Sequence, residues 1–475
     1  MIYVVKGGGD VNKDGENLIK FAKFVLANPY RRVVVVSAPG STEKYPTKLT
    51  KILFQSVGMT KEERWAMINE VVRKRFLDIT KHLGIDFSIL EPSFEHLYNV
   101  LESFDERNSS HIDELKFFGE RCQQYICAEA IKNQGGKAVV KTPWDLGVIL
   151  EELYGVMRFS PTSYRFIRKV FKEIADDEIM VTGGFGGYDL HENLRTLPFG
   201  GTDVSAAHIA RALNADLYEN VKIVDGYANI DPKLVKGSPL EKILIHYDRV
   251  KFDEAIEASK GGAEVIHAHA LRPCRGNKGY KEIPIRVCNL EKPDEYGTLI
   301  TDKEESIYTN ACKFITMQDG IYLVTIEDDN MIDARSYAGE VKARLGARDI
   351  PYDHDATSEN SLVLAIHKDN FDSDETRLQD YAQNIETFFP GAKVSYRSGI
   401  SMITVVNRIK GSGEGTPGIL AKTATALYRQ DINIDFVTQA QEKAIRLGVS
   451  SERAVDGVKV ILKEFWSDEQ YLPKL

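Results

Sequence analysis

The chain has 475 residues, 43% of them hydrophobic and 28% charged, as in a globular protein of roughly two to four domains. A formal net charge of −9 disfavours nucleic-acid binding, which needs basic stripes, and no apolar run approaches the ~20 residues that cross a bilayer. The first residues resemble a strand rather than a signal peptide, so we expect cytoplasmic residence. Five cysteines without CxxC spacing predict packed, reduced thiols and no zinc site.

The first 300 residues alternate strand-like and helix-like segments. Ile2–Val5 and Val33–Val36 are β-branched runs that end in glycine- or proline-containing turns, and a helical period follows the first turn over 17–27. Strand, glycine turn and helix in this order are typical of an α/β sheet with parallel strands. Further strands are predicted at 178–182, 221–227, 263–271 and 283–289, and a further helix at 204–213.

Near residue 298 the pattern changes to two rounds of a βαββαβ-like unit of about 70–80 residues, a size typical of small two-layer domains. A tandem repeat of this kind after a large α/β domain suggests a ligand-sensing module. The glycine-rich stretch 410–415 is expected to be a solvent loop. The predicted strands are 314–326, 360–367, 392–406, 433–439 and 444–450, and the predicted helices are 334–345, 376–389, 418–428 and 451–465.

Three glycine-rich turns follow predicted strands, at 6–9, 183–187 and 200–201. Such turns expose backbone N–H groups that can hold phosphate oxygens without side-chain charge. One turn alone is more often only a tight turn, but three turns, one with Lys6 at the strand end, favour phosphate handling. The GxxxxGK[ST], HRD and DFG signatures are missing, which excludes P-loop enzymes and protein kinases.

Several segments, in chain order, resemble motifs of the aspartate kinases. They are VVKGGG at 4–9, VVVVSAPG at 33–40, FGERCQQYICAEAI at 118–131, the segment 181–213, VDGYANIDPKLV at 224–235, GGAEVIHAHAL at 261–271 and IPIRVCNLEKPDEYGTLI at 283–300. The resemblance implies an α/β amino-acid-kinase (carbamate-kinase-like) domain over 1–300, a three-layer αβα sandwich with a mainly parallel sheet. It also implies two ferredoxin-like βαββαβ ACT domains, over 301–390 and 391–475.

The same resemblance implies ATP-dependent phosphorylation of the side-chain carboxylate of L-aspartate to 4-phospho-L-aspartate, with ATP and Mg²⁺ as cofactors. This is the first step of lysine, threonine and methionine biosynthesis. Phosphoryl transfer leaves little covalent work to the protein, so positioning and positive charge are its main contributions. Lys6 and Asp203 would be catalytic, Glu120 would face the substrate's ammonium group, and no metal site made of side chains is expected.

The remaining implied roles fall into two groups. The nucleotide would contact Lys6, Gly8, Gly9, Ser37, Tyr227, Lys233 and Val265. The amino-acid substrate would contact Thr50, Glu120, Phe185, Thr202 and Asp203.

Taken without the resemblance, several of these residues have simpler interpretations. Glu120 and Arg121 would form a surface pair on a helix, and Asp203 would interact only with a helix dipole. Tyr227 and Phe185 would be packed aromatic side chains. His208, His267 and His269 are most simply packed or exposed residues, with no metal set around them.

The chain departs from the family pattern where charge matters. Phe199 replaces an arginine that would pair with a substrate carboxylate, and a benzyl ring cannot replace a guanidinium fork. Glu264 replaces a lysine, which turns a phosphate-binding charge into a repulsive one unless Mg²⁺ or Lys222 compensates. Lys222-Ile223 replaces Thr-Asp. Three interpretations stay open: an aspartate kinase, a kinase of the same fold acting on another amino-acid carboxylate, and a non-catalytic regulatory homologue.

In the first ACT-type unit, Met331, Asp353, Thr357 and Ser358 match positions that hold an effector in lysine-sensitive members of the family. A carboxylate for an ammonium group and hydroxyls for a carboxylate suit lysine or threonine, although the same residues could form an ordinary polar turn. Ala334 and Ser336 depart from the family's loop. ACT units typically pair between subunits, so the resemblance implies a homodimer or homotetramer.

Overall fold

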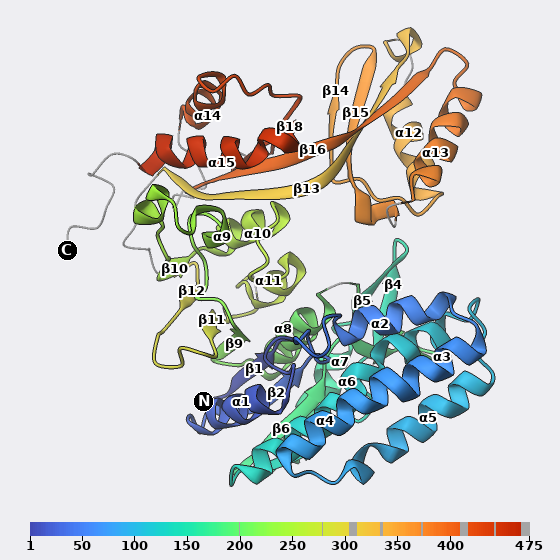
Figure 1. Ribbon diagram of the computed structural model, residues 1–475, viewed down its shortest axis with the longest axis vertical. Helices are drawn as coiled ribbons and strands as arrows, with labels where there is room; N and C mark the ends of the chain where they lie inside the picture. The colour runs from blue at the N-terminus through green and yellow to red at the C-terminus, as the bar shows by residue number, and fades with distance from the viewer. Residues whose placement is uncertain are drawn as a thin grey trace. The chain divides into compact units, whose positions relative to one another are not determined.

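The computed structural model describes residues 1–198, 200–277, 279–303, 311–332, 336–371, 374–408, 417–440 and 443–466 (Figure 1). The chain divides into two units. The N-terminal unit comprises Met1–Tyr227, Tyr247–Phe252 and Val265–Glu305, and the C-terminal unit comprises Ala228–His246, Asp253–Glu264 and Ser306–Leu475. The domain borders expected at 300 and 390 stay predictions.

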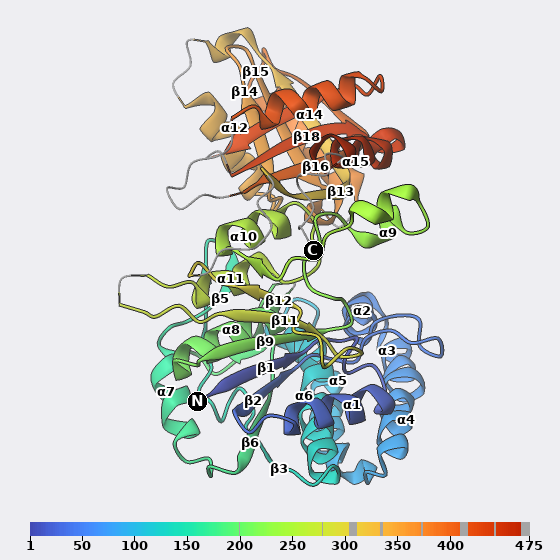
Figure 2. The ribbon, with the colours of Figure 1, turned by 90° about the vertical axis from the view of Figure 1, so that its left-hand side faces the viewer.

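The N-terminal unit is built on an eight-stranded sheet in the order β10-β12-β11-β9-β1-β2-β6-β3 (Figure 2). Its strand pairs are parallel except for β11 with β12, which confirms the predicted α/β fold with a mainly parallel sheet. The strands are β1 Tyr3–Gly7, β2 Arg31–Val36, β3 Lys137–Val140, β6 Glu178–Gly183, β9 Leu217–Lys222, β10 Arg249–Val250, β11 Ile285–Asn289 and β12 Thr298–Ile300.

Helices cover both faces of this sheet. Val5 of β1 lies in the core with α1 (Gly15–Leu26) and α6 (Ser109–Asn133). The next residue, Lys6, points to the opposite face and contacts α8 (Gly201–Leu213), because successive side chains of a strand alternate between faces. On that face, α7 (Ser163–Phe171) and α11 (Ala268–Cys274) pack against α8, and on the other, α2 (Leu49–Gln55), α4 (Lys74–Leu83) and α5 (Glu91–Glu102) pack around α1 and α6.

Two local predictions for this unit are wrong. The segment 263–271, predicted as a strand, ends in α11, because His267 caps that helix and Ala270 and Leu271 are buried in it. The strand predicted at 221–227 ends at Lys222, and the chain then turns at Gly226, whose φ is 96°. The glycine turn that follows β6 leads into another strand, β7 (Gly186–Tyr188).

The C-terminal unit contains an antiparallel sheet in the order β14-β15-β13-β16-β18-β17. The elements predicted here are found, and β14 was missed because its sequence HDAT is short and polar. The strands are β13 Cys312–Glu327, β14 His354–Thr357, β15 Ser361–His367, β16 Lys393–Asn407, β17 Phe436–Ala440 and β18 Ala444–Ser450. The helices are α9 Pro232–Val235, α10 Phe252–Lys260, α12 Tyr337–Gly346, α13 Glu375–Phe388, α14 Ile419–Tyr428 and α15 Ser451–Trp466.

Two long strands, β13 and β16, run through both halves of this sheet. The second part of β13 (321–327) pairs with β15 and with the start of β16, which completes the order β13-α12-β14-β15-α13-β16. The first part of β13 (312–318) pairs with 402–407 of β16, which continues to β18 and β17. The two ferredoxin-like units are therefore confirmed and nested, because the second takes one of its strands from the start of the first. The loop predicted at 410–415 lies outside the described residues.

Among the helices of the described ranges, none has the length and apolar character needed to span a membrane.

The sheet of the N-terminal unit contains a buried ion triad. Glu219 on β9 accepts hydrogen bonds from Arg31 at 2.7 Å and from Arg286 at 3.0 Å, and its side chain is 1% exposed. We predict that Glu219→Ala lowers the free energy of unfolding by about 3–5 kcal/mol, because two guanidinium groups lose their counter-charge inside the protein. Chemical denaturation measures this.

The control is Asp177→Ala, which removes an exposed partner of Lys137 and should leave the free energy of unfolding almost unchanged. Equal losses in the two variants would contradict a special role for the buried triad.

Candidate active site

The carboxyl ends of β1, β2, β6 and β9 meet at one edge of the parallel sheet, and most of the predicted site residues lie there. Lys6, near the end of β1, forms a 2.7 Å salt bridge with Asp203 in the first turn of α8. Both side chains are almost fully buried. The helix begins directly after Gly200, whose left-handed backbone (φ 82°) turns the chain into α8.

The glycines after β1 form a tight turn with no room for side chains. A Cβ on Gly8 would lie 3.2 Å from Lys6 Nζ, and a Cβ on Gly9 would lie 3.2 Å from the carbonyl oxygen of Ala38. Within the described part of the chain, the N–H of Gly9 donates to no protein acceptor, and neither do the first two N–H groups of α8, at Gly201 and Thr202. Unpaired amides of this kind, at a helix start and a glycine turn, suit phosphate oxygens.

Asn12 holds the glycine turn in place, and the sequence offered no signal for this role. Its buried side-chain amide donates to the carbonyl oxygens of Gly7 at 2.8 Å and Gly8 at 3.0 Å. These two carbonyl oxygens therefore have hydrogen-bond donors within the protein, whereas the N–H of Gly9 is left to bind a ligand.

Asp203 is ionised at neutral pH. Burial by itself raises the pKa of a carboxyl group, but the positive charges of Lys6 and Lys222 and the hydrogen bonds from Lys6 and the backbone N–H of His267 outweigh it. Together they lower the pKa of Asp203 to about 2. The carboxylate of Asp203 is therefore ionised throughout the physiological range.

Glu120 lies inside the site and not on the surface. A Cβ on the preceding residue, Gly119, would lie 2.5 Å from Ala38 Cβ, so α6 passes directly beside the end of β2. Glu120 is 3% exposed, and its Oε2 has no hydrogen-bond partner. Burial raises its pKa to about 8 against the opposing effects of the Ala38 amide and of Lys6. The surface-pair interpretation is wrong, since Arg121 instead pairs with Glu114 at 2.6 Å.

Phe185 and Thr202 meet at the end of β6. A Cβ on Gly184 would lie 2.5 Å from Thr202 Cγ2, and the N–H of Phe185 donates to Ser205 Oγ at 3.0 Å. Phe185 is buried with a positive φ of 70°, a strained backbone for a side chain of this size. Thr50, half-buried in the first turn of α2, lies on the helix that packs against α6.

The other predicted nucleotide contacts are more scattered. The N–H of Ser37 donates to the carbonyl oxygen of Gly7 at 3.1 Å, so Ser37 lies beside the glycine turn. Tyr227 is buried, and its N–H donates to Thr298 Oγ1 at 2.9 Å. Val265 lies two residues before His267, whose backbone N–H donates to Asp203 Oδ2 at 3.3 Å. Lys233 belongs to the C-terminal unit, so its role stays a prediction.

Comparison with known proteins identifies the family. A sequence model of the amino acid kinase family matches residues 1–289, more than half of the chain. The chain belongs to the amino acid kinase family. The resemblance to aspartate kinases also extends over the whole chain. It is 25% identical over 473 residues to "Aspartokinase 3" of Bacillus subtilis, covering 98% of both chains. It is 26% identical over 474 residues to the chloroplastic "Aspartokinase 1" of Arabidopsis thaliana, covering 98% of this chain and 80% of the relative.

Solved structures agree with this assignment of the fold. Aspartokinase III of E. coli in complex with aspartate and ADP superposes with a TM-score of 0.80 at 22% identity, covering 98% of this chain and 99% of that one. The same enzyme in complex with lysine and aspartate gives a TM-score of 0.74. The aspartate-kinase resemblance inferred from motif order is thereby confirmed, as is the fold of this amino acid kinase.

Two residues that the motif comparison did not assign to the site also face it. Lys222, at the end of β9, contributes to the low pKa of Asp203, and Asn220 lies beside Lys6 in the register of β1 and β9. The sequence signalled Lys222 by its place in the Lys222-Ile223 pair before VDG and as a charge that could compensate for Glu264. Phe199, where the family has an arginine, lies outside the described residues, and the nearby Arg195 is paired with Asp113 at 3.1 Å.

The predicted effector residues of this amino acid kinase lie around β14. Asp353 precedes the strand and accepts hydrogen bonds from the His367 N–H and the Asn370 side chain, whereas Thr357 and Ser358 lie at its other end. At about 3.3 Å per residue, roughly 13 Å separate the two groups. Met331 is buried in the turn Asp329–Met331, and the departing residue Ala334 lies outside the described residues. Their role as an effector site stays a prediction.

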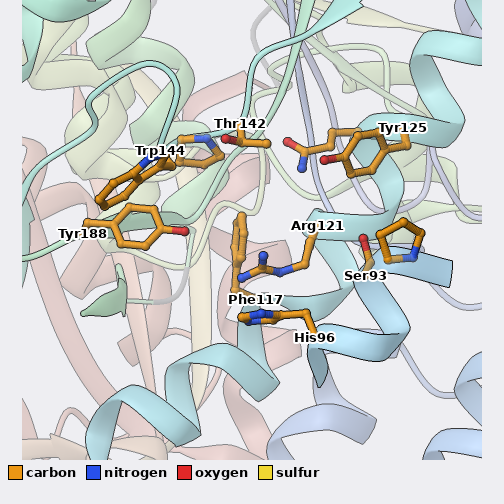
Figure 3. A pocket seen from close by; sticks show the side chains of 11 residues that line it. Ser93, His96, Phe117, Arg121, Tyr125, Thr142, Trp144 and Tyr188 are labelled. Carbon is orange, nitrogen blue, oxygen red and sulfur yellow. The ribbon is translucent and has the colours of Figure 1, made fainter. Parts of the chain in front are cut away.

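A separate cavity of about 300 Å³ contains none of the predicted site residues (Figure 3). Its cation Arg121 is neutralised by Glu114, which also lies 3.0 Å from His96 Nε2. The cavity is lined by Pro92, Ser93, His96, Phe117, Arg121, Gln124, Tyr125, Thr142, Pro143, Trp144 and Tyr188. Gln124 joins its wall to the site, since its Oε1 accepts a hydrogen bond from the N–H of Gly183 at the end of β6.

A metal ion would have few protein ligands here. Among the described residues, no three histidine, cysteine, aspartate or glutamate side chains come close enough together to hold one. Mg²⁺ is usually bound by one or two carboxylates together with substrate phosphates, so the site fits an ion that arrives with the nucleotide.

The raised pKa of Glu120 predicts a pH effect on stability. The carboxyl group of Glu120 keeps its proton up to about pH 8 in the folded protein but only up to about pH 4.5 in the unfolded chain. Its contribution to the free energy of unfolding is therefore complete below pH 4.5 and is lost as the pH rises through 8. Without ligands, wild type should lose about 1.4 kcal/mol of unfolding free energy per pH unit in this window relative to Glu120→Gln. Denaturation of both proteins between pH 5 and pH 8 measures the difference, and parallel pH profiles would contradict a buried, protonated Glu120.

Proposed function

We propose that the protein transfers the γ-phosphoryl group of ATP to the side-chain carboxylate of L-aspartate and forms 4-phospho-L-aspartate and ADP. The observation that carries the proposal is the joint presence, at one sheet edge, of the Lys6–Asp203 pair, the unpaired amides of Gly9 and α8, and the buried Glu120. The complexes of E. coli aspartokinase III with aspartate and ADP, and the full-length similarity to aspartokinases, support it.

In this proposal the amides of Gly9, Gly201 and Thr202 hold the phosphate oxygens. A carboxylate oxygen of the acceptor attacks the γ-phosphorus, a new O–P bond forms, and the bond to the β-phosphate oxygen breaks and releases ADP. Lys6 offsets the negative charge that moves with the phosphoryl group, and Asp203 holds Lys6 in place. Mg²⁺, bound to the nucleotide, would add positive charge at the phosphates.

Glu120 is the proposed partner of the acceptor's ammonium group. Its Oε2 is buried and has no hydrogen-bond partner, a costly arrangement that a cationic ligand would relieve. A bound ammonium would also lower the pKa of Glu120 and ionise it. Phe185 and Thr202, which lie beside Gly184 at the end of β6, would shape the rest of the acceptor pocket.

A second candidate is a kinase of this fold that acts on another amino-acid carboxylate. It is favoured by Phe199, since an arginine is missing there and Arg195 is already paired with Asp113 and, at 3.8 Å, with Asp189. A dicarboxylate acceptor needs a charge-assisted partner for its second carboxylate.

An ATP-dependent hydroxamate assay over aspartate, glutamate and other amino-acid carboxylates tests the proposal. Turnover of aspartate supports it, and turnover of a different carboxylate supports the second candidate. A folded protein that phosphorylates no acceptor would leave the non-catalytic regulatory interpretation.

Whichever acceptor is used, Lys6→Met should lower kcat by at least about 100-fold, because it removes the cation that stabilises the transferred group. Lys169→Met, on an exposed position of α7, should leave kcat unchanged.

We also propose that lysine or threonine inhibits the enzyme through the C-terminal unit, in a homodimer or homotetramer. The complex of E. coli aspartokinase III with lysine supports an amino-acid effector for this architecture.

Asp353→Ala should weaken inhibition at least about tenfold, because it removes the carboxylate proposed to bind an ammonium group. Asp380→Ala, exposed on α13, should not change it. If calorimetry detects binding of neither lysine nor threonine at millimolar concentration, the proposal is refuted.

A further inference from the structure

The last residue of β9, Lys222, is a second lysine on the face of the sheet that carries Lys6. β1 and β9 are parallel neighbours, and their register sets Lys6 beside Asn220. Residues in register on parallel strands point to the same face, and so do residues two apart on one strand. Lys6, Asn220 and Lys222 therefore all face α8, whereas Val5 and Val221 face the core on the other side.

The charges of these groups do not cancel. Lys6 and Asp203 neutralise each other across 2.7 Å, so this pair alone offers an incoming phosphate no net attraction. Lys222 forms no salt bridge with any residue that the structure describes. Its ammonium is the surplus positive charge at this end of the sheet.

The groups around Lys222 indicate that this charge is held in a confined place. Burial lowers the pKa of Lys222, Asp203 opposes that effect, and Lys6 adds to it. Asp10 and Lys48 act on it more weakly and with opposite signs. An anion that bound next to Lys222 would offset its desolvation and favour the charged ammonium.

A second observation also points to a ligand. Asn220 is 0% exposed, yet neither its side-chain oxygen nor its side-chain nitrogen has a hydrogen-bond partner. It lies beside Lys6 across the β1–β9 pair and two residues before Lys222 on β9. Two residues before it on the same strand, Tyr218 donates from its hydroxyl to the carbonyl oxygen of Asp203 at 3.4 Å. A buried amide without partners costs free energy, and a ligand held between the two lysines could supply them.

We propose that Lys222 is a second phosphate-binding lysine, which contacts the β- and γ-phosphate oxygens of the nucleotide together with Lys6, while Asn220 on β9, beside Lys6, donates to the same group. The inference deepens the proposed function, because it assigns these residues to the nucleotide of the same reaction. Lys222 donates hydrogen bonds and transfers no proton, and the bonds that form and break are those of the phosphoryl transfer described above.

The test is equilibrium binding of Mg·ADP and of a non-hydrolysable Mg·ATP analogue by calorimetry, without any acceptor. Lys222→Met should weaken both at least about tenfold, the equivalent of about 1.4 kcal/mol. Lys222→Arg, which keeps the charge, should remain within about threefold of wild type. The matched control is Lys137→Met, an exposed lysine at the amino end of β3 and thus at the opposite edge of the sheet, which should bind like wild type.

Several results would overturn the inference. Wild-type affinity in Lys222→Met, or an equal loss in Lys137→Met, would show that Lys222 does not contact the nucleotide. If Lys222→Met does not fold, as judged by circular dichroism, Lys222→Gln provides the same comparison with a polar side chain. A folded wild-type protein that binds no nucleotide would refute the proposed function itself, whereas nucleotide binding that is insensitive to Lys222 would refute only this inference.

Discussion

The candidate site depends on one buried ion pair, between Lys6 at the end of β1 and Asp203 at the start of α8. Removing two charges from water is costly, and a buried pair often contributes little to stability compared with well-packed apolar side chains. Its physical consequence here is positional. It joins the sheet edge to the first turn of α8, and thereby sets the unpaired amides of that helix opposite those of the glycine turn.

The same pair explains why neighbouring charges matter. Because Lys6 is neutralised by Asp203, attraction for an anionic nucleotide has to come from elsewhere: from backbone amides, from a metal ion that accompanies the phosphates, or from Lys222. Glu120 shows the opposite arrangement, since burial, with its Oε2 unpaired, raises its pKa to about 8. The site therefore has one end suited to phosphate and another suited to an ammonium group, as a kinase for an amino acid requires.

The C-terminal unit achieves a different kind of coupling through its two long strands. β13 and β16 each pair within both ferredoxin-like halves, so the backbones of these two strands join the halves directly. The register of β13 with β16 is irregular between Gln318 and Leu323, where the two halves meet.

The sequence by itself determined the family and the order of most helices and strands, and it predicted Lys6, Asp203 and Glu120 as residues of the proposed site. These follow from local patterns, such as β-branched runs, glycine turns and helical periods, and from short motifs in a fixed order. It could not determine that 263–271 ends in a helix, because the alternation in AEVIHAHAL resembles a strand and only packing of Ala270 and Leu271 overrides it. Only the tertiary structure decided that Lys222 and Asn220 share a face with Lys6, that Glu120 is buried with an unpaired carboxyl oxygen, and that the two ACT-type halves are nested. Each of these depends on strand register or on packing between segments distant in sequence, and a one-residue change of register would turn every such side chain to the opposite face.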